Sequence, residues 1–227
     1  MMARSQTPYL PEDPFTAAGI NRVRQIAKRG AYDRESVYAI LDRGFVAHVA
    51  FIDEDRPVVI PLVYGRSGDR LFLHGHRKSR AMTSSDGEPV SLCITLVDGI
   101  VVGRSIFESS MNYRSVVLHG RAFLVEEAEA RIEALRCVSE HMFPGRWDEV
   151  REPYDKETKG TGVYEVVIEA ASAKVRAGAP IDDYDEFDRD TWVGVVPVTT
   201  AIGRPIADSS VPRDAPIPAS LSRIVKG

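Results

Sequence analysis

Three cations and a hydroxyl group gather at one predicted strand-to-helix junction. Residues 71–80 read Leu-Phe-Leu-His-Gly-His-Arg-Lys-Ser-Arg, where an apolar run ends and a helix is predicted to begin near Lys78. A phosphate dianion is bound by positive charge, hydrogen-bond donors and free N–H groups at a helix N-terminus. The segment therefore predicts a phosphate site at Lys78, Ser79 and Arg80, with His74 at the strand end. The alternative is an exposed basic loop.

A second polar segment, residues 109–116, reads Ser-Ser-Met-Asn-Tyr-Arg-Ser-Val and enters a long apolar run. Its side-chain donors would suit an aromatic cofactor ring with carbonyl and imide edges. The alternative is an ordinary loop at the start of a strand. Asn112, Arg114 and Ser115 are the side chains of interest.

The sequence lacks the motifs of several other kinds of functional site. His48 and His119 lie within predicted strands, and none of the five histidines has metal-ligand spacing. Neither a G-x-S-x-G elbow nor a G-x-x-x-x-G-K phosphate loop is present. Cys93 and Cys137 sit in apolar runs without a C-x-x-C motif, which argues against a zinc site and a disulfide framework.

These segments lie on a predicted all-antiparallel framework. Asp33 is predicted to cap a helix over 34–43 that buries Val37, Ile40 and Leu41 and ends at Gly44. Apolar and β-branched runs then predict short strands over 45–52, 57–64, 71–74, 89–97, 100–107 and 115–125. Asp98-Gly99 between two of these runs predicts a hairpin turn. Strands at such short spacing favour a barrel over a parallel sheet.

The remaining chain is predicted to hold one more helix and two more strands. Helical spacing of Ile132, Leu135, Val138 and Met142 predicts a helix over 126–142. Strands are predicted over 163–170 and 192–198, separated by an acidic loop over 178–190. We predict an N-terminal arm over 1–15, one domain over 16–198 and a C-terminal tail over 199–227.

Composition limits the partners. The chain has 227 residues, 44% hydrophobic and 27% charged, with a formal net charge of −4. A sequence-independent nucleic-acid binder would usually be basic, so that partner is disfavoured. No apolar run is long enough to span a bilayer, and no signal peptide is predicted, so we expect a cytoplasmic protein.

Five stretches together resemble the FMN-binding split barrels, the fold of pyridoxamine 5′-phosphate oxidase. They are residues 29–33 (Arg-Gly-Ala-Tyr-Asp), 73–80, 112–116, 173–178 (Ala-Lys-Val-Arg-Ala-Gly), and 192–194 with Pro197. The resemblance covers roughly residues 20–198 and is nearest to the oxidase-related flavin-nucleotide-binding branch. It implies a mainly β fold with flanking helices, a six-stranded antiparallel split β-barrel, and a homodimer.

The resemblance also implies an FMN site between two subunits. The strand over 58–63 would give the isoalloxazine ring backbone contacts, and the strand end at Leu73 and His74 would flank the ring. A Ser-Arg-Lys triplet would bind the phosphate. Here Ala81 stands at the lysine position, and Lys78 could replace its charge. The implied cofactor-binding residues are Val59, Ile60, Pro61, Leu62, Leu73, His74, Lys78, Ser79, Arg80, Asn112, Arg114, Ser115 and Trp192.

Three functions are compatible with this site. The first is an FMN-dependent oxidoreductase on an unidentified small molecule. The second is a non-catalytic flavin carrier or sensor. The third is a split barrel that uses haem or a deazaflavin, with His74, His76 or His119 as the available haem ligands. The oxidase's substrate-phosphate motifs have no match after Trp192, so pyridoxamine phosphate oxidase activity is not expected.

Overall fold

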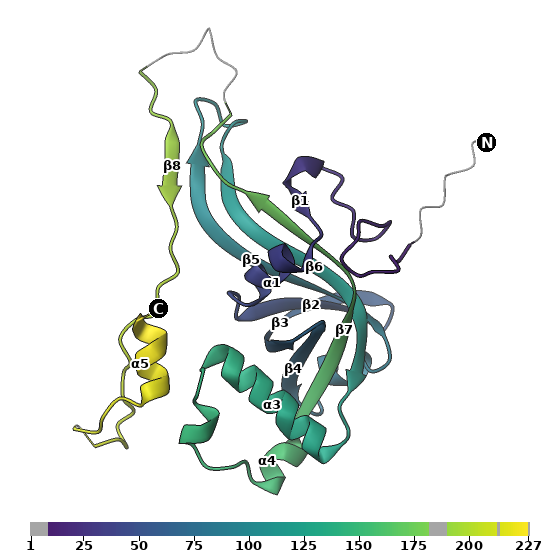
Figure 1. Ribbon diagram of the computed structural model, residues 1–227, viewed down its shortest axis with the longest axis vertical. Helices are drawn as coiled ribbons and strands as arrows, with labels where there is room; N and C mark the ends of the chain where they lie inside the picture. Colours follow the sequence, from purple (N-terminus) through teal and green to yellow (C-terminus); the bar gives the residue numbers. More distant parts are fainter. Residues whose placement is uncertain (1–8, 182–189, 213, 227) are drawn as a thin grey trace. The chain divides into compact units, whose positions relative to one another are not determined.

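Six long strands dominate the part of the chain that the structure describes. The computed structural model describes residues 9–181, 190–212 and 214–226. Their strands β2 to β7 each have seven residues or more, and β1 (Gly30–Ala31) and β8 (Gly194–Pro197) are short. The fold is mainly antiparallel β with flanking helices, as the sequence predicts (Figure 1).

The chain forms two compact units and passes between them repeatedly. Unit 1 contains the described residues of 1–44, 91–119 and 169–200, and unit 2 those of 45–90, 120–168 and 201–227. Strands β5 (Pro89–Val102), β6 (Ser110–Leu124) and β7 (Thr161–Arg176) each contribute residues to both units. The two units are described separately below.

Unit 2 is an antiparallel sheet with helices packed on it. Strand β2 (Val46–Asp53) pairs with β3 (Arg56–Ser67), β3 with β4 (Arg70–His76), and β4 with the first half of β7. The β2–β3 turn is tight because Glu54 and Asp55 adopt left-handed backbone angles, with φ of 47° and 60°. The helices of this unit are α2 (Arg80–Ser84), α3 (Ala128–Met142), α4 (Asp155–Gly160) and α5 (Ala219–Lys226), with a short turn η2 (Trp147–Glu149).

Helix α3 approaches β3 closely because Gly65 has no side chain. A Cβ at Gly65 would lie 2.6 Å from the carbonyl oxygen of Cys137 and 2.7 Å from the Cα of Val138. The side of α3 that is buried carries Arg131, Ala134 and Val138. The predicted buried face of α3 is therefore only partly correct, because Ile132, Leu135 and Met142 are half-buried. Ala134 and Val138, which are smaller, face the sheet where α3 approaches β3 most closely.

Unit 1 holds α1 (Arg34–Leu41), a short turn η1 (Ala27–Arg29) and the remaining strands. Asp33 caps α1 by accepting a hydrogen bond of 2.8 Å from the Ser36 amide, and Val37, Ile40 and Leu41 are buried, as predicted. Strand β1 pairs with the end of β7, and β8 pairs with β5. The N-terminal segment is fastened to β7 by a hydrogen bond from the Ala171 amide to the Pro14 carbonyl, 3.0 Å.

The predicted hairpin at Asp98-Gly99 is wrong, because both residues lie inside the continuous strand β5. The Asp98 carboxylate accepts two hydrogen bonds from Arg114, at 2.7 and 2.9 Å. Strand β8 lies over Gly99, where a Cβ would come within 2.8 Å of Val195. Long-range partners of these two residues thus replace the local turn, and the chain reverses after Val102 instead.

Other differences concern lengths and the C-terminal segment. Strand β3 continues through Gly65–Ser67, where a turn is predicted, and β7 is twice the length of the predicted strand over 163–170. The segment over 199–227, which shows no pattern in the sequence, contains α5, whose Ser220 amide donates to Glu149 at 2.9 Å. Most of the predicted acidic loop lies outside the described residues.

No helix in the described part of the chain is long and apolar enough to cross a membrane.

Candidate functional site

The cationic junction after β4 holds an ion pair that the sequence did not predict. Arg80 Nε lies 3.1 Å from Asp53 Oδ2, and the Ser84 hydroxyl donates to Asp53 Oδ1 at 2.5 Å. Asp53 is the last residue of β2, and the tight β2–β3 turn follows it. Asp53 and Ser84 thus orient Arg80, whose side chain is otherwise exposed.

Backbone donors contribute less to this junction than the sequence predicts. The Lys78 amide donates to His76 Nδ1 at 3.2 Å, the Ser79 amide to the His76 carbonyl at 2.8 Å, and the Arg77 amide to the Gly160 carbonyl at 3.1 Å. Helix α2 has only five residues. An anion here would be bound by the side chains of Lys78, Ser79 and Arg80. Ala81 is buried, so the position of the family lysine is part of the core.

The predicted ring-contacting strand offers an open backbone edge. Strand β3 pairs with β2 over residues 56–63 and with β4 only over Tyr64–Ser67. In the described residues no further strand pairs with β3 over 57–63. Two prolines, Pro57 and Pro61, lie on this stretch, as is usual for an unpaired edge. Along this stretch every second residue turns its N–H and C=O groups away from β2, so these backbone groups could hydrogen-bond a planar ligand.

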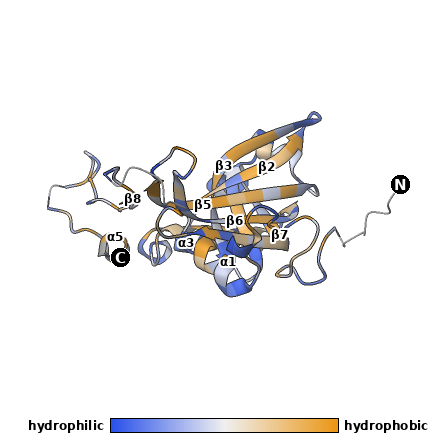
Figure 2. Cartoon of the chain, turned by 90° about the horizontal axis from the view of Figure 1, so that it is seen from above, coloured by the Kyte–Doolittle hydropathy of each residue, from blue (hydrophilic) through white to orange (hydrophobic). Residues whose placement is uncertain are grey.

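One face of the β2–β3 pair is both apolar and exposed. Residues opposite each other in the register share a face, which places Ala50 beside Val59, and His48 beside Pro61. Val59 is 60% exposed and Ile52, on the same face, 59%. Figure 2 shows the hydrophobic colouring along both strands. An exposed apolar face of this kind is typical of a binding surface.

His74 carries the one buried side-chain nitrogen or oxygen of the described residues that has no hydrogen-bond partner, Nδ1. It lies on β4 opposite Val163 of β7, whose side chain is fully buried. Burial lowers the pKa of His74 below its usual 6.5, so its imidazole is neutral at pH 7. The preceding residue, Leu73, is 2% exposed and belongs to the core.

Three of the four remaining predicted residues are engaged in unit 1. Asn112 is buried and donates to the Gly178 carbonyl at 3.1 Å, Arg114 is held by Asp98, and Ser115 donates to the Lys174 carbonyl at 3.4 Å. Arg114 therefore already has a carboxylate partner, which raises its pKa. Trp192, just before β8, is 63% exposed.

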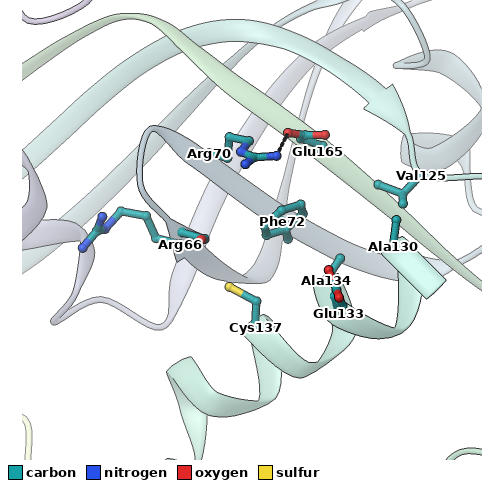
Figure 3. Close-up of a pocket in the computed structure, with 10 residues that line it drawn as sticks. Arg66, Arg70, Phe72, Val125, Ala130, Glu133, Ala134, Cys137 and Glu165 are labelled. Atoms are coloured by element: carbon teal, nitrogen blue, oxygen red, sulfur yellow. Dashed lines mark hydrogen bonds and ion pairs between the residues drawn. The ribbon is translucent and has the colours of Figure 1, made fainter. Parts of the chain in front are cut away.

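A surface pocket of about 310 Å³ in unit 2 lies elsewhere. Figure 3 shows it between α3 and the strands β4 and β7, with Cys137 facing it; Arg70 and Glu165, which line it, are paired at 3.2 Å. Burial raises the pKa of the Cys137 thiol, partly offset by Arg66, so the thiol is protonated at neutral pH and a poor nucleophile. None of the thirteen predicted cofactor-binding residues lines this pocket.

The structure divides the predicted residues between the two units. Nine are in unit 2 and share β3, β4 and the junction after β4: Val59, Ile60, Pro61, Leu62, Leu73, His74, Lys78, Ser79 and Arg80. Asn112, Arg114, Ser115 and Trp192 are in unit 1. Asp53 and Ser84 could not be selected from the sequence, because Asp53 lies about 30 residues before both Arg80 and Ser84, its two partners. Among the described residues, no group of three or more His, Cys, Asp or Glu could hold a metal ion.

An antiparallel sheet with flanking helices is the architecture of the split-barrel proteins. The sequence matches the family described as pyridoxamine 5′-phosphate oxidase over residues 33–175. The chain belongs to this family.

Two solved structures are similar over nearly the whole chain. The flavocytochrome Anf3 from Azotobacter vinelandii is 34% identical, with a TM-score of 0.84, covering 89% of this chain and 94% of that one. The FAD and haem binding protein from Mycobacterium smegmatis is 33% identical, with a TM-score of 0.82, covering 86% and 97%. No curated protein sequence gives a significant match.

Proposed function

We propose that this protein binds a flavin nucleotide and a haem, and that it works as a redox protein. The observation that carries the proposal is His74, a neutral imidazole with a buried nitrogen that no described residue satisfies. Buried polar atoms are almost always hydrogen-bonded in native proteins, so a bound group is the simplest partner for this side chain. Two relatives of about one-third identity bind flavin or haem groups according to their names.

His74 suits the haem part of the proposal. A neutral imidazole is the form that binds haem iron, and burial keeps this histidine neutral at pH 7. His119 is the alternative ligand, since its pKa is also lowered by burial, but its Nδ1 is already 2.8 Å from the Ser91 hydroxyl. His76 accepts the Lys78 amide hydrogen and lies on the exposed strand end.

The junction after β4 suits the phosphate of a flavin nucleotide. Lys78 and Arg80 supply charge, and the open edge of β3 supplies backbone groups for the ring. We infer FAD rather than FMN as the nucleotide. A terminal phosphate like that of FMN carries nearly two negative charges at pH 7, whereas each phosphate of a dinucleotide carries one. Asp53 offsets Arg80, and Ala81 replaces a cation, so the site is weakly positive.

A homodimer completes the proposal. The exposed apolar face of β2 and β3 is the kind of surface that a second copy would cover. Flavin and haem then supply electron transfer, while the chain binds and orients them and limits water. Free thiols at Cys93 and Cys137 fit a cytoplasmic location.

The test is the absorption spectrum of the purified full chain, before and after addition of FAD, FMN and haemin separately. We expect flavin bands that survive dialysis after FAD addition, and a sharp Soret band after haemin addition. Flavin released from the protein by heat should run as FAD in chromatography. A protein that binds flavin but leaves haemin unbound would reduce the proposal to a flavin carrier or flavoenzyme. A protein that binds neither would refute it.

A further inference from the structure

Unit 1 contains a buried arginine whose charge is not neutralised. Arg176, at the end of β7, is 6% exposed. Its Nη1 donates to Asn112 Oδ1 and, at 3.4 Å, to the Gly178 carbonyl. Both acceptors are neutral, and no described carboxylate lies within ion-pair distance of it. Burying a cation without an anion is costly, so such a site calls for an explanation.

A second buried arginine shows what a purely structural role looks like. Arg131 on α3 is 8% exposed, and all three of its side-chain nitrogens donate to backbone carbonyls, those of Val125, Glu126 and Thr158. Arg176 uses one nitrogen out of three. Its Nε and Nη2 have no hydrogen bond to any described residue. They are not fully buried either, because the one fully buried unpaired side-chain nitrogen or oxygen of the described residues is Nδ1 of His74, in unit 2.

Arg29 is a second positive charge close to Arg176. Burial lowers the pKa of Arg176, the nearby positive charge of Arg29, at the end of η1, lowers it further, and Tyr113 raises it. Strand pairing of Gly30 with Lys174 brings these two segments together. Like charges brought together in a poorly solvated place repel each other, which an anion between them would relieve.

We propose that Arg176 and Arg29 form a binding site for an anionic group of a ligand, a carboxylate or a phosphate. The planar guanidinium of Arg176 presents two free donors side by side, the arrangement that binds such oxyanions in a bidentate way. Asn112 fixes the guanidinium from the opposite side and is a positioning residue. The proposal rests on the proposed function, which supplies the ligand. The anion is a haem propionate or a flavin phosphate.

The first experiment uses neither flavin nor haem. Inorganic pyrophosphate is titrated calorimetrically into the full chain carrying Arg80→Ala, which removes the other predicted phosphate site. Adding Arg176→Gln should weaken binding by about tenfold or more, because a charged bidentate contact is lost. Arg29→Ala, at a less buried position, should weaken it too, and it tests the site if Arg176→Gln fails to fold. Arg136→Gln, which removes an exposed cation paired with Asp148, should leave binding unchanged.

Two outcomes would overturn the proposal. One is a parent chain that does not bind pyrophosphate. The other is binding that stays unchanged in folded Arg176→Gln and Arg29→Ala variants. Because no cofactor is present, either result is separate from failure of flavin or haem binding.

A second experiment identifies the source of the anion. In the otherwise native chain, Arg176→Gln is compared with wild type for FAD against riboflavin, and for haem against its dimethyl ester. If a flavin phosphate is the anion, the variant should weaken FAD and leave riboflavin unaffected. If a propionate is the anion, it should weaken haem and leave the ester unaffected. If Arg176→Gln binds both FAD and haem as tightly as the wild type does, the proposal is contradicted.

Discussion

At the scale of single residues, Arg80 and Arg114 are both held by carboxylates from other segments of the chain, Asp53 and Asp98. Arg80 is where the sequence predicts a phosphate ligand, but it is already oriented by Asp53 and Ser84. Arg114 donates to Asp98 through both Nε and Nη2. Residue type and order predicted the cationic junction, whereas the carboxylate partners could not be predicted because they come from other strands.

Arg80→Ala should weaken flavin binding. The change removes a charge-assisted contact with phosphate, worth roughly 1.5–3 kcal/mol, with the lower end expected because the side chain is exposed. Dissociation constants from flavin fluorescence quenching measure it. Arg70→Ala is the matched control, since Arg70 is another exposed arginine paired with a carboxylate in the same unit. Equal losses in both variants would mean that the phosphate does not contact Arg80.

His74→Ala should abolish the Soret band while leaving flavin bands largely intact, because the variant removes the proposed iron ligand. His48→Ala is the control, since His48 is exposed on β2. The wild-type band should also persist as the pH falls below 6.5 and fade only as the pH passes through the lower folded pKa of His74. Burial lowers that pKa, so the neutral imidazole that binds iron remains at pH values where an exposed histidine is already protonated. A band that survives in His74→Ala but not in His119→Ala would transfer the ligand role to His119.

At the scale of elements, the alternation of apolar residues predicted most strands, but not where long strands continue. Asp98-Gly99 has the composition of a hairpin turn, yet Arg114 and β8 hold both residues in β5. Similarly, α3 was predicted, but its buried side was not, because Gly65 lets the helix backbone approach β3. The local sequence pattern determines whether a segment forms a helix or a strand. Contacts between distant segments determine where that element ends and which of its faces is buried.

Gly65→Ala should destabilise the protein strongly. The added Cβ meets the α3 backbone at Cys137 and Val138, which cannot move aside as a flexible side chain would. Overpacking of this kind costs about 1–3 kcal/mol, and we expect the upper end. Urea unfolding followed by circular dichroism measures the change. Gly160→Ala is the control, because nothing lies within 4 Å of its would-be Cβ; a similar loss there would show that the packing argument is wrong.

The ion pair Asp98–Arg114, which joins β5 to β6, should make the free energy of unfolding depend on pH in the acidic range. Hydrogen bonds from Arg114 lower the pKa of Asp98 below 3.8. The pair therefore stabilises the fold above pH 3.8 and loses this effect as the pH falls through the lower folded pKa. Arg114→Gln should reduce unfolding free energy at pH 7 more than at pH 2.5. A pH-independent loss would mean that the ion pair is not its source.

At the scale of the whole molecule, the family and fold class could be predicted from the chain, but the division into two units could not. No stretch of composition marks the boundaries, three of which fall inside β5, β6 and β7. The predicted arm, domain and tail boundaries remain predictions.

Ile52→Lys should weaken the proposed homodimer. Ile52 is 59% exposed on the apolar β2–β3 face, and a buried lysine at an interface is costly. Light scattering should give twice the 25.1 kDa chain mass for wild type and a lower mass for the variant at the same concentration. Ile206→Lys is the control at another exposed isoleucine. A wild-type monomer that binds flavin and haem would contradict the dimer.

The interleaving of the two units has a consequence for synthesis. Unit 1 needs residues of 169–200, and unit 2 needs residues beyond 200, so neither is complete until nearly all of the chain has left the ribosome. Strand β1 (Gly30–Ala31) must wait for strand β7 before it can pair. Contacts between such distant segments form slowly, and the nascent chain exposes unpaired strands meanwhile. Chaperones that shield extended apolar chains should therefore matter more for its production than for its function.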